Sequence, residues 1–158
     1  MNDLLGKKAE AKIKGWLDRP DDGYSFDRIP DQMTGFYAVS RNICDFICYK
    51  YPDIYYIESK ATWKDNFPFS MIQDHQRDGL LKKSKIKGCH GWVIVLFATH
   101  QRAFKLEIQD IVALEEAGQK SLNIKKIDKW TIPYKEIQTI PNNRKELLDY
   151  TGEIEDLL

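Results

Sequence analysis

The chain has 158 residues, which suits one ordinary domain with a real core and is too short for two sizeable ones. Its 24 basic and 24 acidic residues cancel, and a zero net charge counts against a protein that holds nucleic acid by charge alone. With no apolar run of membrane-spanning length and no basic-plus-apolar leader, we expect a cytoplasmic protein without membrane contact.

The N-terminal part of the chain predicts one helix and one short strand. Apolar residues recur every three or four positions from Asp3 to Asp18, as in an amphipathic helix, and Asp3 suits its N-cap. Residues 19–23 end this helix, and residues 24–29 favour a strand. The following segment, 30–42, is rich in turn formers and predicts a long loop, a kind of segment that often carries function.

Two predicted strands at the centre of the chain bring two acidic residues together. The strands cover 43–49 and 54–62, and the intervening residues 50–53 favour a turn. Folding back at this turn puts Asp45 opposite Glu58, and directly opposed strand residues have Cβ atoms roughly 5 Å apart. The sequence therefore predicts a pair of neighbouring carboxylates.

This pair, with the lysine that follows it, indicates a particular chemistry. Opposed carboxylates repel each other unless a cation lies between them, and Mg²⁺ prefers such oxygen ligands. Lys60 lies two positions after Glu58 and shares its face of the strand. The pattern of Asp45 and Glu58-Ser59-Lys60 predicts a metal-dependent phosphodiesterase. The alternative, an exposed cross-strand pair, would be destabilising.

The three cysteines predict reduced thiols. Their odd number and the absence of Cys-x-x-Cys spacing argue against a disulfide framework and a zinc knuckle. Cys44 and Cys48 lie four residues apart on one predicted strand, which places both on the face opposite Asp45.

The second half of the chain predicts a mixed α/β or α+β plan. Ser70 and Gln73 form a capping-box pattern that predicts a helix over Met71–Lys83, and Trp92–Phe97 is a continuous apolar run typical of a central strand. Further predicted elements are a strand at 102–108, a short helix at 111–114 that ends before Gly118, a strand within 123–133 and a helical turn at 143–148. We expect one domain over residues 1–158, with an acidic tail, 144–158, that faces water.

Four groups of residues in this order resemble a known nuclease family. They are Gly6–Glu10, which reads Gly-x-x-x-Glu, the spacing from Asp45 to Glu58 and Lys60, the segment Asn66–Gln76 and, more thinly, Lys120–Pro133. Together they resemble the PD-(D/E)XK nuclease superfamily and, within it, the RecU-type Holliday-junction resolvases. Two features depart from the pattern: Cys44 stands where the superfamily name has proline, and residues 26–41 are fewer than in the family's protruding stalk.

The resemblance implies a restriction-endonuclease-like fold with a central mixed β-sheet flanked by helices. It also implies a homodimer with two active sites that cuts four-way DNA junctions with Mg²⁺ or Mn²⁺, in a bacterial cytoplasm or, for a phage-encoded member, the host cytoplasm.

Within the expected active site, Asp45, Glu58 and the main-chain carbonyl of Ser59 are the predicted metal ligands. Lys60 would orient and help deprotonate the attacking water, or neutralise charge on the phosphorane. Glu10 would hold a second metal or a metal-bound water, and a solvated helix glutamate is an equal alternative.

Residues 60–87 carry seven basic residues against three acidic ones, which suits contact with DNA. Candidate DNA contacts fall in three places. The start of the helix after the catalytic strand favours phosphate, its basic end could follow a duplex arm, and aromatic residues of the loop at 30–42 could stack on unpaired bases. These residues are, in that order, His75 and Gln76; Lys82, Lys83 and Lys85; and Phe36, Tyr37 and Arg41. The helix dipole alone would select such lysines, and core or dimer packing would equally explain the aromatics.

Two other functions are compatible with the sequence. One is a repair or restriction-type endonuclease that acts on linear duplex DNA. The other is a non-catalytic DNA-binding or protein-binding module on the same scaffold, against which the intact Asp45, Glu58 and Lys60 argue.

Overall fold

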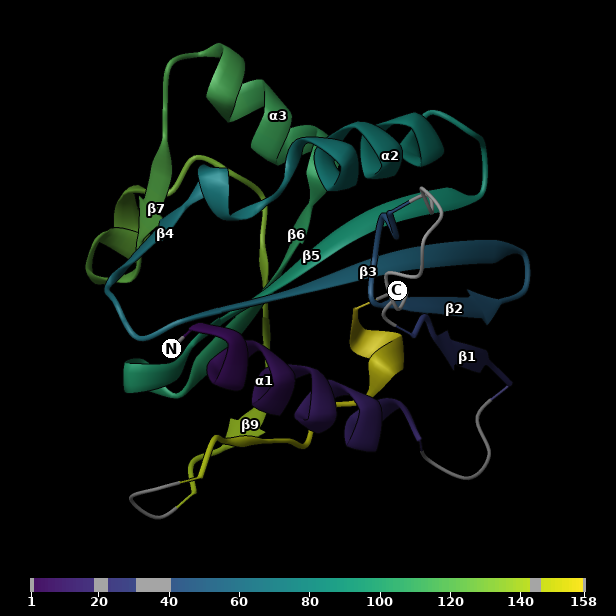
Figure 1. Ribbon diagram of the computed structural model, residues 1–158, viewed down its shortest axis with the longest axis horizontal. Coiled ribbons are helices and arrows are strands. Elements are labelled where there is room, and N and C mark those ends of the chain that lie inside the picture. Colours follow the sequence, from purple (N-terminus) through teal and green to yellow (C-terminus); the bar gives the residue numbers. More distant parts are fainter. Residues whose placement is uncertain (1, 19–22, 31–40, 143–145, 158) are drawn as a thin grey trace, which may run out of the picture.

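The computed structural model describes residues 2–18, 23–30, 41–142 and 146–157. Its longer elements form a sandwich of helices on the two faces of one sheet (Figure 1). The α-helices are α1 (Asn2–Leu17), α2 (Asp74–Ser84) and α3 (Ile108–Glu116). The strands are β1 (Ser25–Arg28), β2 (Phe46–Lys50), β3 (Asp53–Thr62), β4 (Asn66–Pro68), β5 (Cys89–Phe97), β6 (Arg102–Glu107), β7 (Ser121–Asn123), β8 (Lys135–Ile137), β9 (Thr139–Ile140) and β10 (Asp149–Tyr150). None of the helices in the described part of the chain is long and apolar enough to cross a membrane.

The main sheet has six strands in the order β1-β2-β3-β5-β6-β8. Strand β3 pairs parallel to β5, while the other neighbours in this sheet are antiparallel. The parallel step requires the crossover that α2 provides between β3 and β5. Seven consecutive residues of β5, from Gly91 to Phe97, are buried, which confirms the prediction of a central strand. The expected mixed α/β sheet flanked by helices is therefore observed.

Two hydrophobic cores lie on opposite faces of this sheet. Helix α1 covers one face, and α2 and α3 cover the other (Figure 1). Strand β3 supplies both cores, because its side chains alternate: Tyr55 and Ile57 pack on the α1 side, and Tyr56 packs on the α2 side. A residue on the α2 side of β3 is therefore enclosed between the sheet and a helix.

The prediction that Cys44 and Cys48 share a face is wrong. Cys48 is buried in the α1-side core and Cys44 in the α2-side core. Strand β2 begins only at Phe46, and the chain bends at Asp45, so the alternation of a strand does not extend back to Cys44.

The predicted start of the second helix is also wrong. Helix α2 begins at Asp74 with Gln73 as its N-cap, and the capping box joins Gln73 to Gln76 instead of Ser70 to Gln73. Before it, residues Phe69–Met71 form a short 3₁₀ turn. Phe69 and Ile72 are buried in the α2-side core. Because their packing keeps residues 69–72 in a non-α-helical conformation, α2 begins only at Asp74.

The C-terminal part of the chain differs from expectation in two ways. The predicted strand within 123–133 is largely a 3₁₀ helix, Ile124–Lys129, although β7 ends at Asn123. Residues 146–148 are irregular, while 143–145 of the predicted helical turn lie outside the described residues.

The acidic tail does not simply face water. Its charged side chains, such as Glu146 and Asp149, are exposed, but its apolar residues enter the α1-side core. Trp16 stacks on Tyr150 with ring centroids 5.2 Å apart and donates a hydrogen bond to the carbonyl of Gly152. The apolar residues of this segment are Leu147, Leu148, Tyr150, Ile154 and Leu157.

Candidate active site

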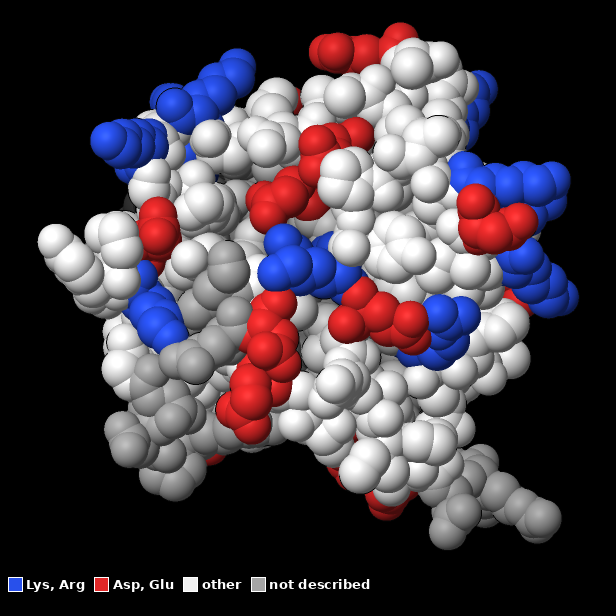
Figure 2. Space-filling view, turned by 180° about the vertical axis from the view of Figure 1, so that it is seen from behind, with Lys and Arg blue, Asp and Glu red and all other residues white. Residues whose placement is uncertain are grey.

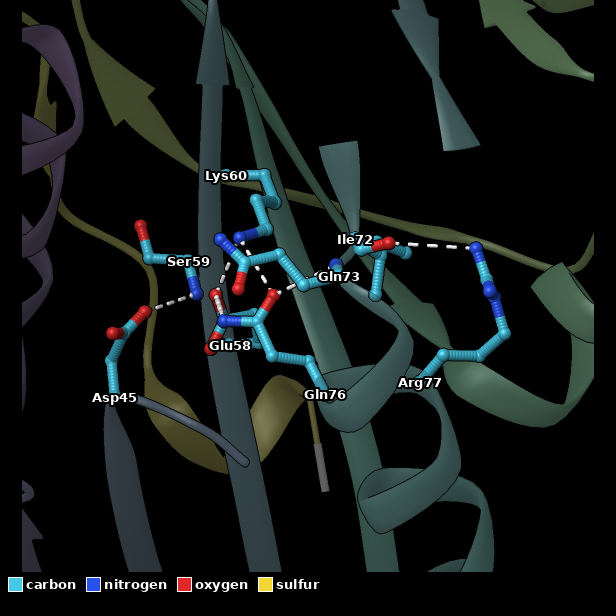
Figure 3. A network of polar contacts seen from close by, with 8 residues as sticks. All are labelled: Asp45, Glu58, Ser59, Lys60, Ile72, Gln73, Gln76 and Arg77. Atoms are coloured by element: carbon cyan, nitrogen blue, oxygen red, sulfur yellow. Dashed lines mark hydrogen bonds and ion pairs between the residues drawn. The ribbon is translucent and has the colours of Figure 1, made fainter. Parts of the chain in front are cut away.

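The β2–β3 hairpin brings the two predicted carboxylates close together. Phe46 pairs with Ile57, and the amide of Asp45 also donates to the carbonyl of Ile57, at 3.0 Å, so the residue before β2 is still hydrogen-bonded to β3. The Oδ2 atom of Asp45 accepts a hydrogen bond of 2.8 Å from the amide of Ser59 (Figure 3). Asp45 is therefore attached to β3 beside Glu58.

Glu58 and Lys60 form a close ion pair on the α2 side of β3. Their Oε1 and Nζ atoms are 2.6 Å apart. Glu58 is only 2% exposed, whereas most glutamates remain in water. Burial, followed by the negative charge of Asp45, raises the pKa of Glu58 to about 8, although Lys60 opposes this shift. The site therefore holds a carboxylate that needs further positive charge to remain ionised.

The two oxygens of Glu58 have different surroundings. Oε1 receives Lys60 and the side chain of Gln76, whereas Oε2 is buried and, within the described residues, has no hydrogen-bond partner. A buried anionic oxygen without a partner is costly. With Asp45 nearby, the available ligands are oxygens, which suits a hard divalent cation such as Mg²⁺. The residues present thus fit the predicted metal.

The side chain of Gln76, predicted as a DNA contact, forms hydrogen bonds within the protein. Its amide nitrogen donates to Oε1 of Glu58 at 2.7 Å, and its amide oxygen accepts from Nζ of Lys60 at 3.0 Å (Figure 3). We therefore find Gln76 within the polar network of the predicted catalytic residues, a position that sequence reasoning missed. The sequence located this side chain at the start of a helix, but its contacts with Glu58 and Lys60 depend on how that helix packs on β3.

Glu10 lies on α1 and is held by an arginine. Its Oε2 accepts from Nη2 of Arg28 at 2.9 Å, and its charge makes a minor contribution to raising the pKa of Glu58. No group of three or more acidic, histidine or cysteine side chains among the described residues is arranged to hold a metal. The metal-binding roles of Glu10 and of the Ser59 carbonyl stay predictions.

The predicted DNA contacts at the basic end of α2 lie away from this network. His75 is half-buried beside Gln76, whereas Lys82 and Lys83 lie in the last turn of α2, eleven residues long and so about 16 Å from end to end. Lys83 lies over the ring of Tyr56, with Nζ 5.2 Å from its centroid. Lys85 follows this helix and is exposed, as is Arg41, while Phe36 and Tyr37 lie outside the described residues.

The face opposite the viewer of Figure 1 carries both signs of charge. Figure 2 shows acidic and basic side chains interleaved there, without a broad basic patch among the described residues. This distribution agrees with the zero net charge. DNA binding at this face would therefore depend on local basic groups.

Comparison with known proteins gives a matching family and weak similarity to solved structures. Residues 24–156 match the family RecU, described as Recombination protein U. Among solved structures, Hjc of Archaeoglobus fulgidus, a Holliday junction resolvase from an archaeal hyperthermophile, matches with 14% identity and a TM-score of 0.44. That match covers 66% of this chain and 78% of Hjc, and it is too weak to carry an argument. No curated protein matches the sequence.

Proposed function

We propose that this chain, which belongs to the Recombination protein U family, is a metal-dependent endonuclease that resolves four-way DNA junctions. Family membership supports the nuclease activity and the branched substrate. The observation that carries the chemistry is the buried carboxylate of Glu58, which is ion-paired through one oxygen and has no partner among the described residues on the other. Such a group suits a cation-binding active site.

In the proposed site, Asp45 and Glu58 would hold Mg²⁺ or Mn²⁺, with the Ser59 carbonyl and Glu10 as further ligands. When bound, the ion supplies a Lewis acid for phosphate oxygens and lowers the pKa of water. The oxygen-only ligand set favours these hard ions over softer metals.

Lys60 acts on the reacting phosphate. Its ammonium group lies 2.6 Å from Glu58 and is mostly buried, so its charge is poorly screened by water. It orients the attacking water and neutralises charge that develops on the phosphorus oxygens. In the hydrolysis, the attacking water loses a proton to solvent and its oxygen forms a bond to phosphorus. The bond from phosphorus to the leaving nucleotide oxygen breaks, and that oxygen takes up a proton from solvent.

The proposal includes a homodimer in the cytoplasm of a bacterium or of a phage-infected host. A four-way junction resolved by symmetric cuts requires two phosphodiester hydrolyses, and each protomer would supply one site. Sedimentation analysis with and without junction DNA tests this point, and a monomer in both conditions would contradict it.

The central experiment compares substrates, metal and one carboxylate. A four-way junction and a linear duplex of matched arm sequence are incubated with the protein in Mg²⁺, Mn²⁺ or EDTA. We expect cleavage of the junction with either metal and none in EDTA. Glu58→Gln should lose activity by at least roughly a hundredfold, whereas Glu116→Gln, an exposed carboxylate on α3, should cleave like the wild type.

Each outcome has a distinct meaning. Cleavage in EDTA, or full activity of Glu58→Gln, would refute the mechanism. Equal cutting of junction and duplex would remove the junction preference and leave a duplex endonuclease. Binding of the junction without cleavage in either metal would indicate a non-catalytic DNA-binding module.

A further inference from the structure

The turn that follows the predicted catalytic strand carries an exposed tryptophan. Strand β3 ends at Thr62, and β4 begins at Asn66. Between them, Trp63 is 58% exposed, whereas Trp16 and Trp92 are buried. Tryptophan is highly buried in most proteins, so an indole left in water at the end of this strand is unusual.

Contacts from two distant segments hold the backbone of this turn. The hydroxyl of Thr99 donates to the carbonyl of Trp63 at 2.6 Å, and the amide of Ile124 donates to the carbonyl of Asp65 at 2.9 Å. Both carboxylate oxygens of Asp65 are engaged as well, each at 2.7 Å, by Nε2 of His100 and Nζ of Lys125. The turn is therefore fixed from both sides, while the ring that it carries stays exposed.

Trp63 lies a short way along the chain from the predicted catalytic lysine. Lys60 is the labelled residue nearest the arrowhead of β3 in Figure 3, and past this end the chain turns into β4 (Figure 1). Three residues of extended chain span at most about 11 Å, which bounds the distance between the Cα atoms of Lys60 and Trp63. Phosphates of one DNA strand follow each other at roughly 3.4 Å along a duplex. A ring in this turn thus reaches bases within about three nucleotides of a phosphate bound at Lys60.

The neighbours of the ring in the turn favour a nucleobase over a protein surface. Thr62, Lys64 and Asp65 are polar, and Lys64 is exposed. The core of a protein–protein interface is apolar and depleted in charge, which this turn is not. An aromatic ring beside a basic side chain is instead the combination that binds unpaired nucleic acid, because the ring stacks on a base and the cation lies near the backbone.

We propose that Trp63 stacks on a base exposed at the branch point of DNA and thereby makes the protein select junctions over continuous duplex, a specificity role that rests on the proposed function. In a continuous duplex, both faces of each base are covered by its neighbours, so stacking would first require a base to be displaced, at a cost of a few kcal/mol. At a branch point the stack is interrupted and a face is free. Trp63 therefore contributes to junction binding and adds little to duplex binding.

The fixed turn lowers the cost of this contact. Its backbone is ordered before DNA binds, so stacking restricts only the side chain of Trp63. That side chain has two rotatable bonds and loses little freedom for the contact area that it offers. The stacking is distinct from that predicted for the loop at 30–42, since Trp63 belongs to the turn after β3.

The test separates an aromatic face from apolar bulk. Trp63→Phe keeps a ring that can stack, whereas Trp63→Leu keeps an apolar side chain without one. Tyr51→Leu is the matched control, because Tyr51 is an exposed aromatic residue in the turn before β3, and the ten residues of that strand place the two turns about 30 Å apart.

Two binding measurements in EDTA require no cleavage. The first is the affinity of each variant for a four-way junction and for a linear duplex of matched arm sequence. The second is the fluorescence of 2-aminopurine at the branch point and of the protein's tryptophans, of which Trp63 is the most exposed. Circular dichroism establishes that each variant is folded, and sedimentation analysis gives its oligomeric state.

We expect Trp63→Leu to lose roughly 5- to 150-fold in junction affinity, the effect of removing one stacked base. Its duplex affinity should stay within about twofold of wild type, and Trp63→Phe and Tyr51→Leu should keep most of the junction affinity. Junction DNA should quench the tryptophan fluorescence of the wild type and of Tyr51→Leu far more than that of Trp63→Phe. In Mg²⁺, Trp63→Leu should need more protein for half-maximal cleavage and reach nearly the wild-type rate at saturation.

Several results would overturn this role. Unchanged junction affinity of Trp63→Leu would show that the ring does not contact DNA, and an equal loss for junction and duplex would show a contact without selectivity. A change of oligomeric state in Trp63→Leu, or in Trp63→Phe, would assign the ring to a contact between two copies of the chain. If the wild type binds the junction and cleaves nothing, the proposed endonuclease fails, while affinity and fluorescence still decide whether Trp63 stacks.

Discussion

Two acidic regions of this protein use their carboxylates in opposite ways. At the site on β3, Glu58 is 2% exposed and is surrounded by the sheet and α2. In the C-terminal segment, Glu146 and Asp149 are exposed, and the apolar residues between and after them are buried. Burial raises the pKa of Glu58 to about 8, whereas the hydrogen bond from Lys12, with a further one from Asn142, lowers the pKa of Asp149.

The difference shows that the number of acidic residues does not identify a functional site. The C-terminal segment is richer in acidic residues, yet its described charges, such as Glu146 and Asp149, are exposed, while its apolar residues anchor it in the core. At the site, a single carboxylate is buried, and burial of its charged form is costly unless a cation, as in the proposed function, offsets it.

Replacing the lysine of the site should affect activity most. Lys60→Met removes the ammonium group 2.6 Å from Glu58, so we expect the single-turnover cleavage rate to fall by roughly 10²–10⁴-fold. Lys126→Met, an exposed lysine of the 3₁₀ helix after β7, should cleave normally. A Lys60→Met rate within a factor of three of wild type would show that this lysine takes no part in hydrolysis.

Truncating a buried residue of the C-terminal segment should affect stability most. Leu148 is 0% exposed in the α1-side core, so Leu148→Ala should reduce the free energy of unfolding by about 2–5 kcal/mol. Urea denaturation measures this change. The exposed neighbour change Glu146→Gln should stay within about 0.5 kcal/mol of wild type. Equal stability of both variants would mean that this segment is not part of the core.

The pH dependence of stability should distinguish the two regions by sign. The folded-state pKa of Glu58 is about 8, above its ordinary value of 4.5, so the folded protein binds this proton more tightly than the unfolded chain. Its contribution is fully present below pH 4.5 and is lost as the pH rises through about 8. In EDTA, Glu58→Gln should therefore gain stability over wild type between pH 5 and pH 9, on the order of a few kcal/mol.

Urea denaturation of both proteins at these two pH values checks the prediction, with Glu146→Gln as the matched control. Parallel behaviour of Glu58→Gln and wild type across this range would contradict a raised pKa. Saturating Mg²⁺ should reduce the wild-type loss, because a ligand that binds only the folded state stabilises it.

The exposed ion pair of the C-terminal segment should matter least. Asp149 lies 2.7 Å from Lys12 but is largely exposed, so solvent screens the pair. Asp149→Asn should lower the free energy of unfolding by only about 0.2–1 kcal/mol at neutral pH. This small difference should disappear at acid pH, where the depressed pKa no longer keeps Asp149 charged. A loss as large as that of Leu148→Ala would show that solvent does not screen the pair of Asp149 and Lys12.

Much of the sheet and its catalytic hairpin could be predicted from the sequence. Alternation along β3 placed Glu58 and Lys60 on one face, and the turn at 50–53 set the register that brings Asp45 beside β3. These inferences succeeded because strand alternation and a short turn are local properties. The start of α2 was missed because the choice between Ser70 and Gln73 as cap depended on the burial of Phe69 and Ile72, which are contacts with distant strands.

The sequence by itself determined the secondary structure of the central strands and the carboxylate-lysine pattern, because these follow from the spacing of neighbouring residues. Only the tertiary structure decided that Glu58 is buried against α2, that Gln76 contacts Glu58 and Lys60, and that the C-terminal segment joins the core. Each of these depends on groups that are 16 or more residues apart or on different layers of the fold. Burial and its effect on pKa arise from such contacts, and no local pattern specifies them.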